Sequence, residues 1–207
     1  MLWQSLIPLS IWRRPETRRR ENVKKPPRTI FFVQALILLS LAAQPVAAEL
    51  PYDPLAFSPA FTPQILDLTV NDLGRKRDIP IRVYLPSDTF PSPMVFFSHG
   101  LGGSREGSAY LGQHWAARGY VVVYVQHPGS DTSVWQKKPV IECMAAMKRA
   151  ANPQNFLLRV KDIHVVLDQL ESWNASRDSA LVGRLDPKRV GMSGHSFGAL
   201  TTQAVSG

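Results

Sequence analysis

The sequence has very little cysteine: Cys143 is the only one in 207 residues. A lone cysteine excludes an intramolecular disulfide bond and a metal site built from cysteines. Basic clusters are confined to residues 1–29, where eight Arg or Lys and two Glu account for +6 of the net charge of +8. The remainder has no basic run, so we expect no nucleic-acid partner.

Long apolar runs are also absent. The longest candidate, Ile30–Ala43, has fourteen positions and is interrupted by Gln34 and Ser40. A membrane-spanning helix needs about 20 apolar residues. The preceding Lys and Arg residues and the small residues Val46–Ala48 are typical of a secretory signal peptide. We expect cleavage after Ala48 and a secreted or periplasmic product without a stable membrane span; an uncleaved anchor is the alternative.

Composition divides the chain into three parts. Residues 1–48 form a basic leader plus the signal peptide, and residues 49–63 are a proline-rich, extended lead-in without strand or helix periodicity. Residues 64–207 have the patterns of a folded domain. Because the basic leader is unusually long for an export signal, a later translation start, at Val23, is an open hypothesis.

Strand patterns open the folded part. Polar and apolar residues alternate in Gln64–Val70 and in Ile79–Leu85, which predicts an antiparallel hairpin at a sheet edge. The unbroken apolar runs Pro93–Ser98 and Tyr120–Val125 are typical of parallel strands covered on both faces. A further short strand is predicted at Val190–Met192.

Helical patterns separate these strands. One spans Ser108–Arg118 and ends at Gly119, and another begins at Asn152-Pro153. The second has apolar residues at three- and four-residue steps, namely Phe156, Val160, Ile163, Leu167 and Leu170. The order of strands and helices predicts an α/β fold with a mostly parallel sheet, an antiparallel edge hairpin and flanking helices.

The sequence Gly194–Gly198 is a G-x-S-x-G motif that directly follows a predicted strand. A serine in this position can sit at the tip of a sharp strand-to-helix turn, where Gly194 and Gly198 allow close backbone approach. Ser196 is therefore a candidate nucleophile. A serine hydroxyl needs an adjacent base, normally a histidine held by a carboxylate.

A glycine-rich stretch, His99–Gly103, follows the predicted strand Pro93–Ser98. Such a loop can turn a backbone N–H toward the oxygen that becomes negative during acyl transfer. We expect the two donors to be the N–H groups of Leu101 and Phe197. A flexible turn is the alternative reading, whereas a phosphate-binding loop is excluded because no Gly-Lys-Ser/Thr ending is present.

Four ordered stretches together resemble the dienelactone hydrolase-like branch of the α/β-hydrolases, in particular the platelet-activating-factor acetylhydrolase relatives. They are His99–Ser104, Arg118–Val123, His127–Asp131 and Gly194–Ala199, and the resemblance covers roughly Asp67–Gly207. It implies the N-terminal portion of an α/β-hydrolase fold. It further implies a secreted serine esterase without metal or other cofactor, which acts on a small-molecule or lipid ester through an acyl-enzyme on Ser196.

One feature departs from that family, in which an Asp and then a His follow the serine. No histidine follows Ser196 here, and the chain ends eleven residues after it. We expect a fragment that lacks the triad Asp and His and is poorly active alone. A non-catalytic protein that binds esters or lipids is the alternative function.

The remaining candidates are supporting residues. His195 is expected to pack beside the turn and His99 to brace the glycine-rich loop. His127 and Asp131 follow the carboxyl end of a predicted strand, where ligands bind in open α/β sheets. With Trp135 they are possible pocket residues, although a structural role is the alternative. The supporting glycines are Gly100, Gly102, Gly194 and Gly198.

Overall fold

A computed structural model of the chain describes residues 61–87 and 91–207. These residues belong to one structural unit, residues 55–207. The predicted leader, signal peptide and cleavage site, and nearly all of the predicted lead-in, lie outside the described residues.

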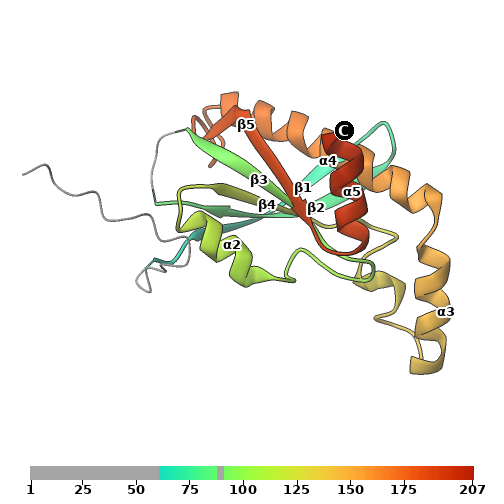
Figure 1. The fold of residues 1–207 in the computed structure, drawn as a ribbon. Coiled ribbons are helices and arrows are strands. Elements are labelled where there is room, and N and C mark those ends of the chain that lie inside the picture. Colours follow the sequence, from blue (N-terminus) through green and yellow to red (C-terminus); the bar gives the residue numbers. More distant parts are fainter. Residues whose placement is uncertain (1–60, 88–90) are drawn as a thin grey trace, which may run out of the picture. The chain divides into compact units, whose positions relative to one another are not determined.

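The described part contains a five-stranded sheet with the order β1-β2-β4-β3-β5 (Figure 1). β1 and β2 form an antiparallel hairpin, β2 pairs antiparallel with β4, and β3 pairs parallel with both β4 and β5. The predicted edge hairpin and parallel strands are confirmed. The strands are β1 (Gln64–Asp72), β2 (Arg77–Leu85), β3 (Ser92–Ser98), β4 (Val121–Val125) and β5 (Leu185–Gly194).

Pro80 lies in β2, which has neighbours on both sides. The pairing of β2 with β4 runs only from Ile81 to Tyr84, so Pro80 falls just beyond it. The Pro80 carbonyl accepts a hydrogen bond from the backbone N–H of Gln126 (N···O 2.9 Å). Because the nitrogen and carbonyl of a strand residue point to the same side, the missing N–H of Pro80 costs no bond to β1.

Helices cover both faces of the sheet (Figure 1). α2 packs on one face, against a cluster that includes Tyr84, Phe97 and Tyr124. α4 and α5 pack on the other face, where Ile163, Val166 and Leu170 of α4 join the main core. The helices are α2 (Ala109–Ala116), the short 3₁₀ helix η1 (Thr132–Val134), α3 (Val140–Ala150), α4 (Pro153–Ala175) and α5 (Phe197–Ser206). No described helix is long and apolar enough to cross a membrane.

The helix predicted from Asn152-Pro153 is α4. The Asn152 side chain accepts a hydrogen bond from the Asn155 N–H, and Pro153 occupies the first turn. Its inner face differs from the predicted apolar stripe, because Arg159 and Asp162 are buried in the N-terminal half while Phe156 is only half-buried. α3 was not predicted from the sequence.

Candidate active site

Ser196 lies at a sharp turn between β5, which ends at Gly194, and α5, which begins at Phe197. Its backbone has φ 54° and ψ −114°, a strained conformation for a residue with a side chain. Ser196 is exposed. The turn therefore presents the hydroxyl-bearing side chain to solvent, as a nucleophile elbow does.

The two motif glycines let this turn sit directly on the end of β3. A Cβ atom added at Gly194 would meet the backbone of Gly198 and the hydroxyl of Thr202, and one at Gly198 would overlap the carbonyl groups of Ser98 and His99. The His195 N–H also donates to the Ser98 carbonyl (3.2 Å). Side chains at either glycine position would push the serine turn away from β3.

Residues 100–104, which we call the glycine loop, follow β3. The backbone of this loop both donates and accepts hydrogen bonds. The Gly102 N–H donates to the Ser130 carbonyl (2.8 Å), and the Thr132 N–H donates to the Gly103 carbonyl (2.9 Å). The indole N–H of Trp135 donates to the Gly102 carbonyl (2.8 Å). The loop is thus held in one conformation by the segment that follows β4.

Gly102 also needs to be a glycine. Its φ of +72° is unfavourable for other residues, and a Cβ atom there would come within 2.6 Å of the Met147 thioether of α3. Met147 and Trp135 therefore close over the glycine loop. Because both side chains follow β4, the segment from η1 to α3 helps to shape the site.

His99 braces the first residue of the loop. The His127 backbone N–H donates to His99 Nε2 (3.1 Å), so Nε2 is an acceptor and Nδ1 carries the proton. Nδ1 then donates to the Gly100 carbonyl (2.6 Å). Burial and the Arg159 charge lower the His99 pKa to about 4, which keeps the ring neutral.

The glycine loop and the serine turn line one hollow of about 240 Å³. Leu101 and Ser196 both belong to its wall. Within the described part of the chain, the N–H groups of Leu101 and Phe197 make no hydrogen bond. Oxyanion holes are built from free backbone N–H donors of this kind; Phe197, however, lines the neighbouring groove and not this hollow. The residues that line the hollow are Phe97, His99, Gly100, Leu101, Gly102, Gly103, Ser104, Gly107, Ser108, His195 and Ser196.

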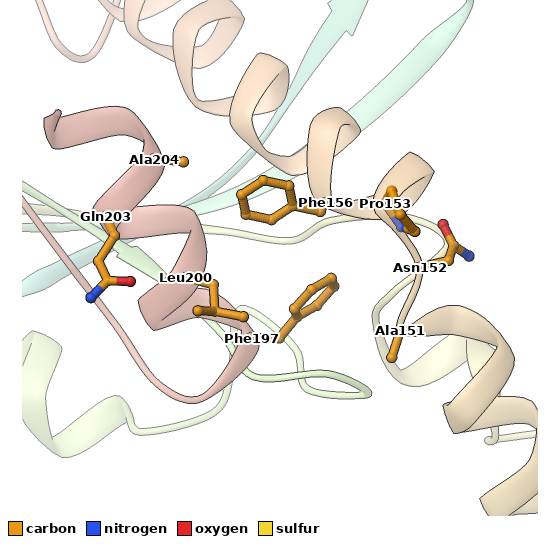
Figure 2. Close-up of a pocket in the computed structure, with 8 residues that line it drawn as sticks. All are labelled: Ala151, Asn152, Pro153, Phe156, Phe197, Leu200, Gln203 and Ala204. Atoms are coloured by element: carbon orange, nitrogen blue, oxygen red, sulfur yellow. The ribbon is translucent and has the colours of Figure 1, made fainter.

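A second, apolar groove of about 570 Å³ lies between α5 and the N-terminal end of α4 (Figure 2). The rings of Phe156 and Phe197 lie with their centres 6.4 Å apart, and Leu200 lies beside them on α5. Phe197 directly follows Ser196, so the groove begins one residue from the nucleophile candidate. Ala151, Asn152, Pro153, Phe156, Phe197, Leu200, Gln203 and Ala204 line it.

Beneath the site lies a buried polar network centred on His127. Its Nδ1 lies 3.0 Å from Asp162 Oδ2 and its Nε2 lies 3.0 Å from Ser98 Oγ. Because Asp162 also receives two hydrogen bonds from Arg77, its carboxylate is charged and His127 Nδ1 is the donor. Burial lowers the His127 pKa to about 3, so the ring is neutral.

The partners Ser98, His127 and Asp162 are the residue types of a catalytic triad, but they serve here as structure. Each is 0% exposed, and none lines either hollow described above. Ser98 Oγ is also occupied as the acceptor of a hydrogen bond from Arg159 (2.9 Å). A substrate cannot reach this serine.

Arg159 joins the two halves of the candidate site and is itself 0% exposed. From α4 its guanidinium donates to Thr201 Oγ1 of α5 (3.1 Å) and to Ser130 Oγ (2.9 Å). It also donates to Ser98 Oγ and to the His99 carbonyl. Burial lowers its pKa to about 10, so it stays charged at neutral pH.

The other sequence candidates lie where they support the loop. Asp131 is buried; it caps η1 by accepting hydrogen bonds from Ser133 and receives one from the Gln126 side chain (2.8 Å). Neither Asp131 nor His127 lines the pockets described above, which agrees with the structural alternative for both. His195 is exposed beside Ser196. Within the described residues, no histidine nitrogen forms a hydrogen bond with Ser196.

Sequence reasoning did not identify Arg159, Asp162 or Met147. The available signal was the charge pair Arg159 and Asp162 at a three-residue step on the inner side of α4. A guanidinium and a carboxylate that interrupt the buried face of a helix require polar partners in the core.

Comparison with known proteins agrees with this geometry. Residues 82–154 match the family described as platelet-activating factor acetylhydrolase, isoform II. This segment includes the glycine loop and its supports but not Ser196. The fold is similar to that of a ferulic acid esterase from Streptomyces cinnamoneus, with a TM-score of 0.52 and 22% identity over 72% of this chain and 57% of that one. The chain thus has the fold of an α/β-hydrolase, and its residues 82–154 are similar to the platelet-activating factor acetylhydrolases.

A cold-adapted esterase from an Arctic intertidal metagenomic library has a TM-score of 0.49 and 16% identity over 69% of this chain and 54% of that one. The chain thus spans a little over half the length of these two solved structures. A comparison with curated protein sequences gave no match.

Proposed function

We propose that this α/β-hydrolase cleaves carboxylic esters through an acyl-enzyme on Ser196. The observation that carries the proposal is that Ser196, in a strained turn, shares a hollow with the glycine loop, while the N–H groups of Leu101 and Phe197 are free. A nucleophile opposite two fixed donors is suited to acyl transfer.

In the proposed reaction, Ser196 Oγ forms a bond to the ester carbonyl carbon. The carbonyl oxygen becomes an oxyanion and accepts hydrogen bonds from Leu101 and Phe197. The bond from carbon to the alcohol oxygen then breaks, and the proton lost by Oγ reaches that oxygen through a base. Water attacks the acyl-enzyme in the same way and releases the acid.

The described residues supply no hydrogen-bonded base for Ser196. Because no histidine within the described residues forms a hydrogen bond with Ser196, we expect slow turnover when this chain is tested alone. Removing members of a catalytic triad leaves only the rate enhancement of the oxyanion site and binding. The chain should therefore form an acyl-enzyme with activated esters far more readily than with ordinary ones.

The apolar groove beside Phe197 supports an ester with an aromatic or aliphatic group. Its volume of about 570 Å³ lies in the range of small-molecule sites. The groove equally favours the second candidate function, which is ester or lipid binding without catalysis. The two functions differ in whether Ser196 becomes acylated.

The decisive experiment is mass spectrometry of the intact chain after incubation with p-nitrophenyl acetate. We expect one acetyl group on Ser196 and faster acetylation when imidazole is added as an external base. The variant Ser196→Ala should lose this modification, while Ser206→Ala, an exposed serine at the other end of α5, should retain it. If Ser196 stays unmodified with imidazole present while the chain binds an ester saturably, the esterase proposal is contradicted and the binding function is supported.

We further propose that the chain is exported by its N-terminal segment. The support is the sequence pattern of a basic stretch, an apolar run and small residues before Ala48. The product would then meet its ester substrates outside the cytoplasm.

A further inference from the structure

The outer face of α3, defined here as Val140, Ile141, Met144 and Ala145, is apolar and is not covered by any other part of the described residues 61–87 and 91–207. Val140, Ile141 and Met144 are 88%, 89% and 78% exposed. Such large side chains at nearly full exposure on one helix are unusual, because a helix normally buries its apolar stripe. The opposite side of α3 is the side that packs, through the buried Ala146 and Ala150.

Basic residues border this apolar face at both ends. Lys137 and Lys138 precede α3, and Lys148 and Arg149 lie in its last turn; all four are exposed. Glu142 is the single acidic residue between positions 137 and 149. An apolar helix face bordered by Lys and Arg is suited to the boundary between acyl chains and anionic headgroups.

The same helix touches the candidate active site from its inner side. Met147 packs against Gly102 of the glycine loop, and Trp135, just before α3, donates to the Gly102 carbonyl. Ala151, the residue after α3, lines the apolar groove. One short segment thus joins the uncovered face to both hollows beside Ser196.

We propose that the outer face of α3 docks onto an anionic lipid surface, which places the glycine loop and the apolar groove next to esters held in that surface. The delivery of esters rests on the proposed esterase function, whereas the docking itself does not. A second copy of the chain is disfavoured as the occupant, because two such faces would bring their four basic residues together.

The test uses a fluorophore at a single position of the full chain, since the basic leader could itself bind anionic vesicles. Cys143→Ser removes the only cysteine, and Met144→Cys in that background is labelled with the polarity-sensitive dye NBD. The matched control carries Leu73→Cys, because Leu73 is an apolar residue in the β1–β2 turn with a similar exposure of 86%. Both proteins are mixed with vesicles of phosphatidylcholine with or without phosphatidylglycerol.

We expect the label at position 144 to become brighter and shift to the blue only with phosphatidylglycerol, and the label at position 73 to change little. In the protein labelled at position 144, Lys137→Gln with Lys138→Gln should weaken the binding that this label reports about tenfold or more, while Lys161→Gln on the exposed side of α4 should not. Equal responses at both positions, or none at 144, would overturn the docking surface. Dimerisation that is abolished by Ile141→Ser, without a lipid response, would assign the face to a second copy.

The docking result is independent of catalysis. If label 144 enters the vesicle but Ser196 is not acylated in the mass-spectrometry experiment, the lipid surface stands and the esterase proposal fails. If Ser196 is acylated and the label at position 144 stays in water, the esterase proposal stands and the lipid-docking proposal fails.

Discussion

The guanidinium carbon of Arg159 lies 4.9 Å from the centre of the Phe197 ring. Phe197 supplies one of the two free N–H groups beside Ser196, and Arg159 also donates to the His99 carbonyl, two residues before Leu101. A single buried side chain on α4 therefore contacts both the first residue of α5, which carries one proposed oxyanion donor, and His99, which directly precedes the glycine loop that carries the other. Because the guanidinium has several fixed N–H groups, it can hold both at once.

Replacing Arg159 by Met should destabilise the chain by about 3 kcal/mol, because the hydroxyl and carbonyl partners lose their donor in the core. Urea denaturation measures this difference. Lys161→Met, an exposed position on the same helix, serves as the matched control and should change the stability by less than about 0.5 kcal/mol.

Arg159→Lys separates position from charge. A lysine keeps the positive charge but cannot bridge α5 and the glycine loop with several donors. We expect slower acetylation of Ser196 while the fold persists at low temperature. An unchanged acetylation rate in a folded Arg159→Lys protein would show that the bridge does not position the donors.

Gly198→Ala should displace α5 from β3, since the new methyl group would overlap the Ser98 carbonyl. We expect a loss of about 3 kcal/mol or more and no acetylation of Ser196. Gly191→Ala in β5 is the matched control, because a Cβ atom there would lie 3.9 Å from the Met94 carbonyl oxygen, an ordinary van der Waals contact. Equal stability of the two variants contradicts the close approach of the turn to β3.

The serine turn and the glycine loop could be predicted from the sequence because glycine and serine in fixed order encode backbone geometry. The hairpin and the buried strands followed from apolar patterns. Arg159 and Asp162 were not predicted, since a charged residue on a helix normally faces solvent and their three-residue spacing is a weak signal. α3 was not predicted because its apolar residues on the outer side face solvent. They therefore do not form the stripe that a core-facing helix shows.

The two buried histidines predict a pH dependence of stability. Burial lowers the pKa of His127 to about 3 and that of His99 to about 4, whereas a histidine in the unfolded chain has a pKa of about 6.5. Below pH 6.5 the unfolded chain therefore binds protons that the folded chain does not. The stability that these neutral rings contribute is complete above pH 6.5 and is lost as the pH falls toward 4.

The free energy of unfolding should thus fall by up to about 2.7 kcal/mol per pH unit between pH 6 and pH 5, where two extra protons bind on unfolding. Urea denaturation at pH 7, 6 and 5 measures the slope, and His99→Asn should reduce it by about half. A flat profile over this range would mean that the two rings are protonated in the folded chain.

Trp135→Phe tests whether the segment after β4 fixes the glycine loop. The variant keeps an aromatic ring near Met147 but removes the indole N–H that donates to the Gly102 carbonyl. Because the variant removes one hydrogen bond between neutral groups, we expect a loss of only about 1 kcal/mol in stability. The rate of Ser196 acetylation should fall by a larger factor than the folded fraction does, since the position of the Leu101 N–H depends on the loop conformation. The free energy of unfolding and the acetylation rate can be measured on the same samples. If the rate falls only as much as the folded fraction does, Trp135 supports the fold and does not position the loop.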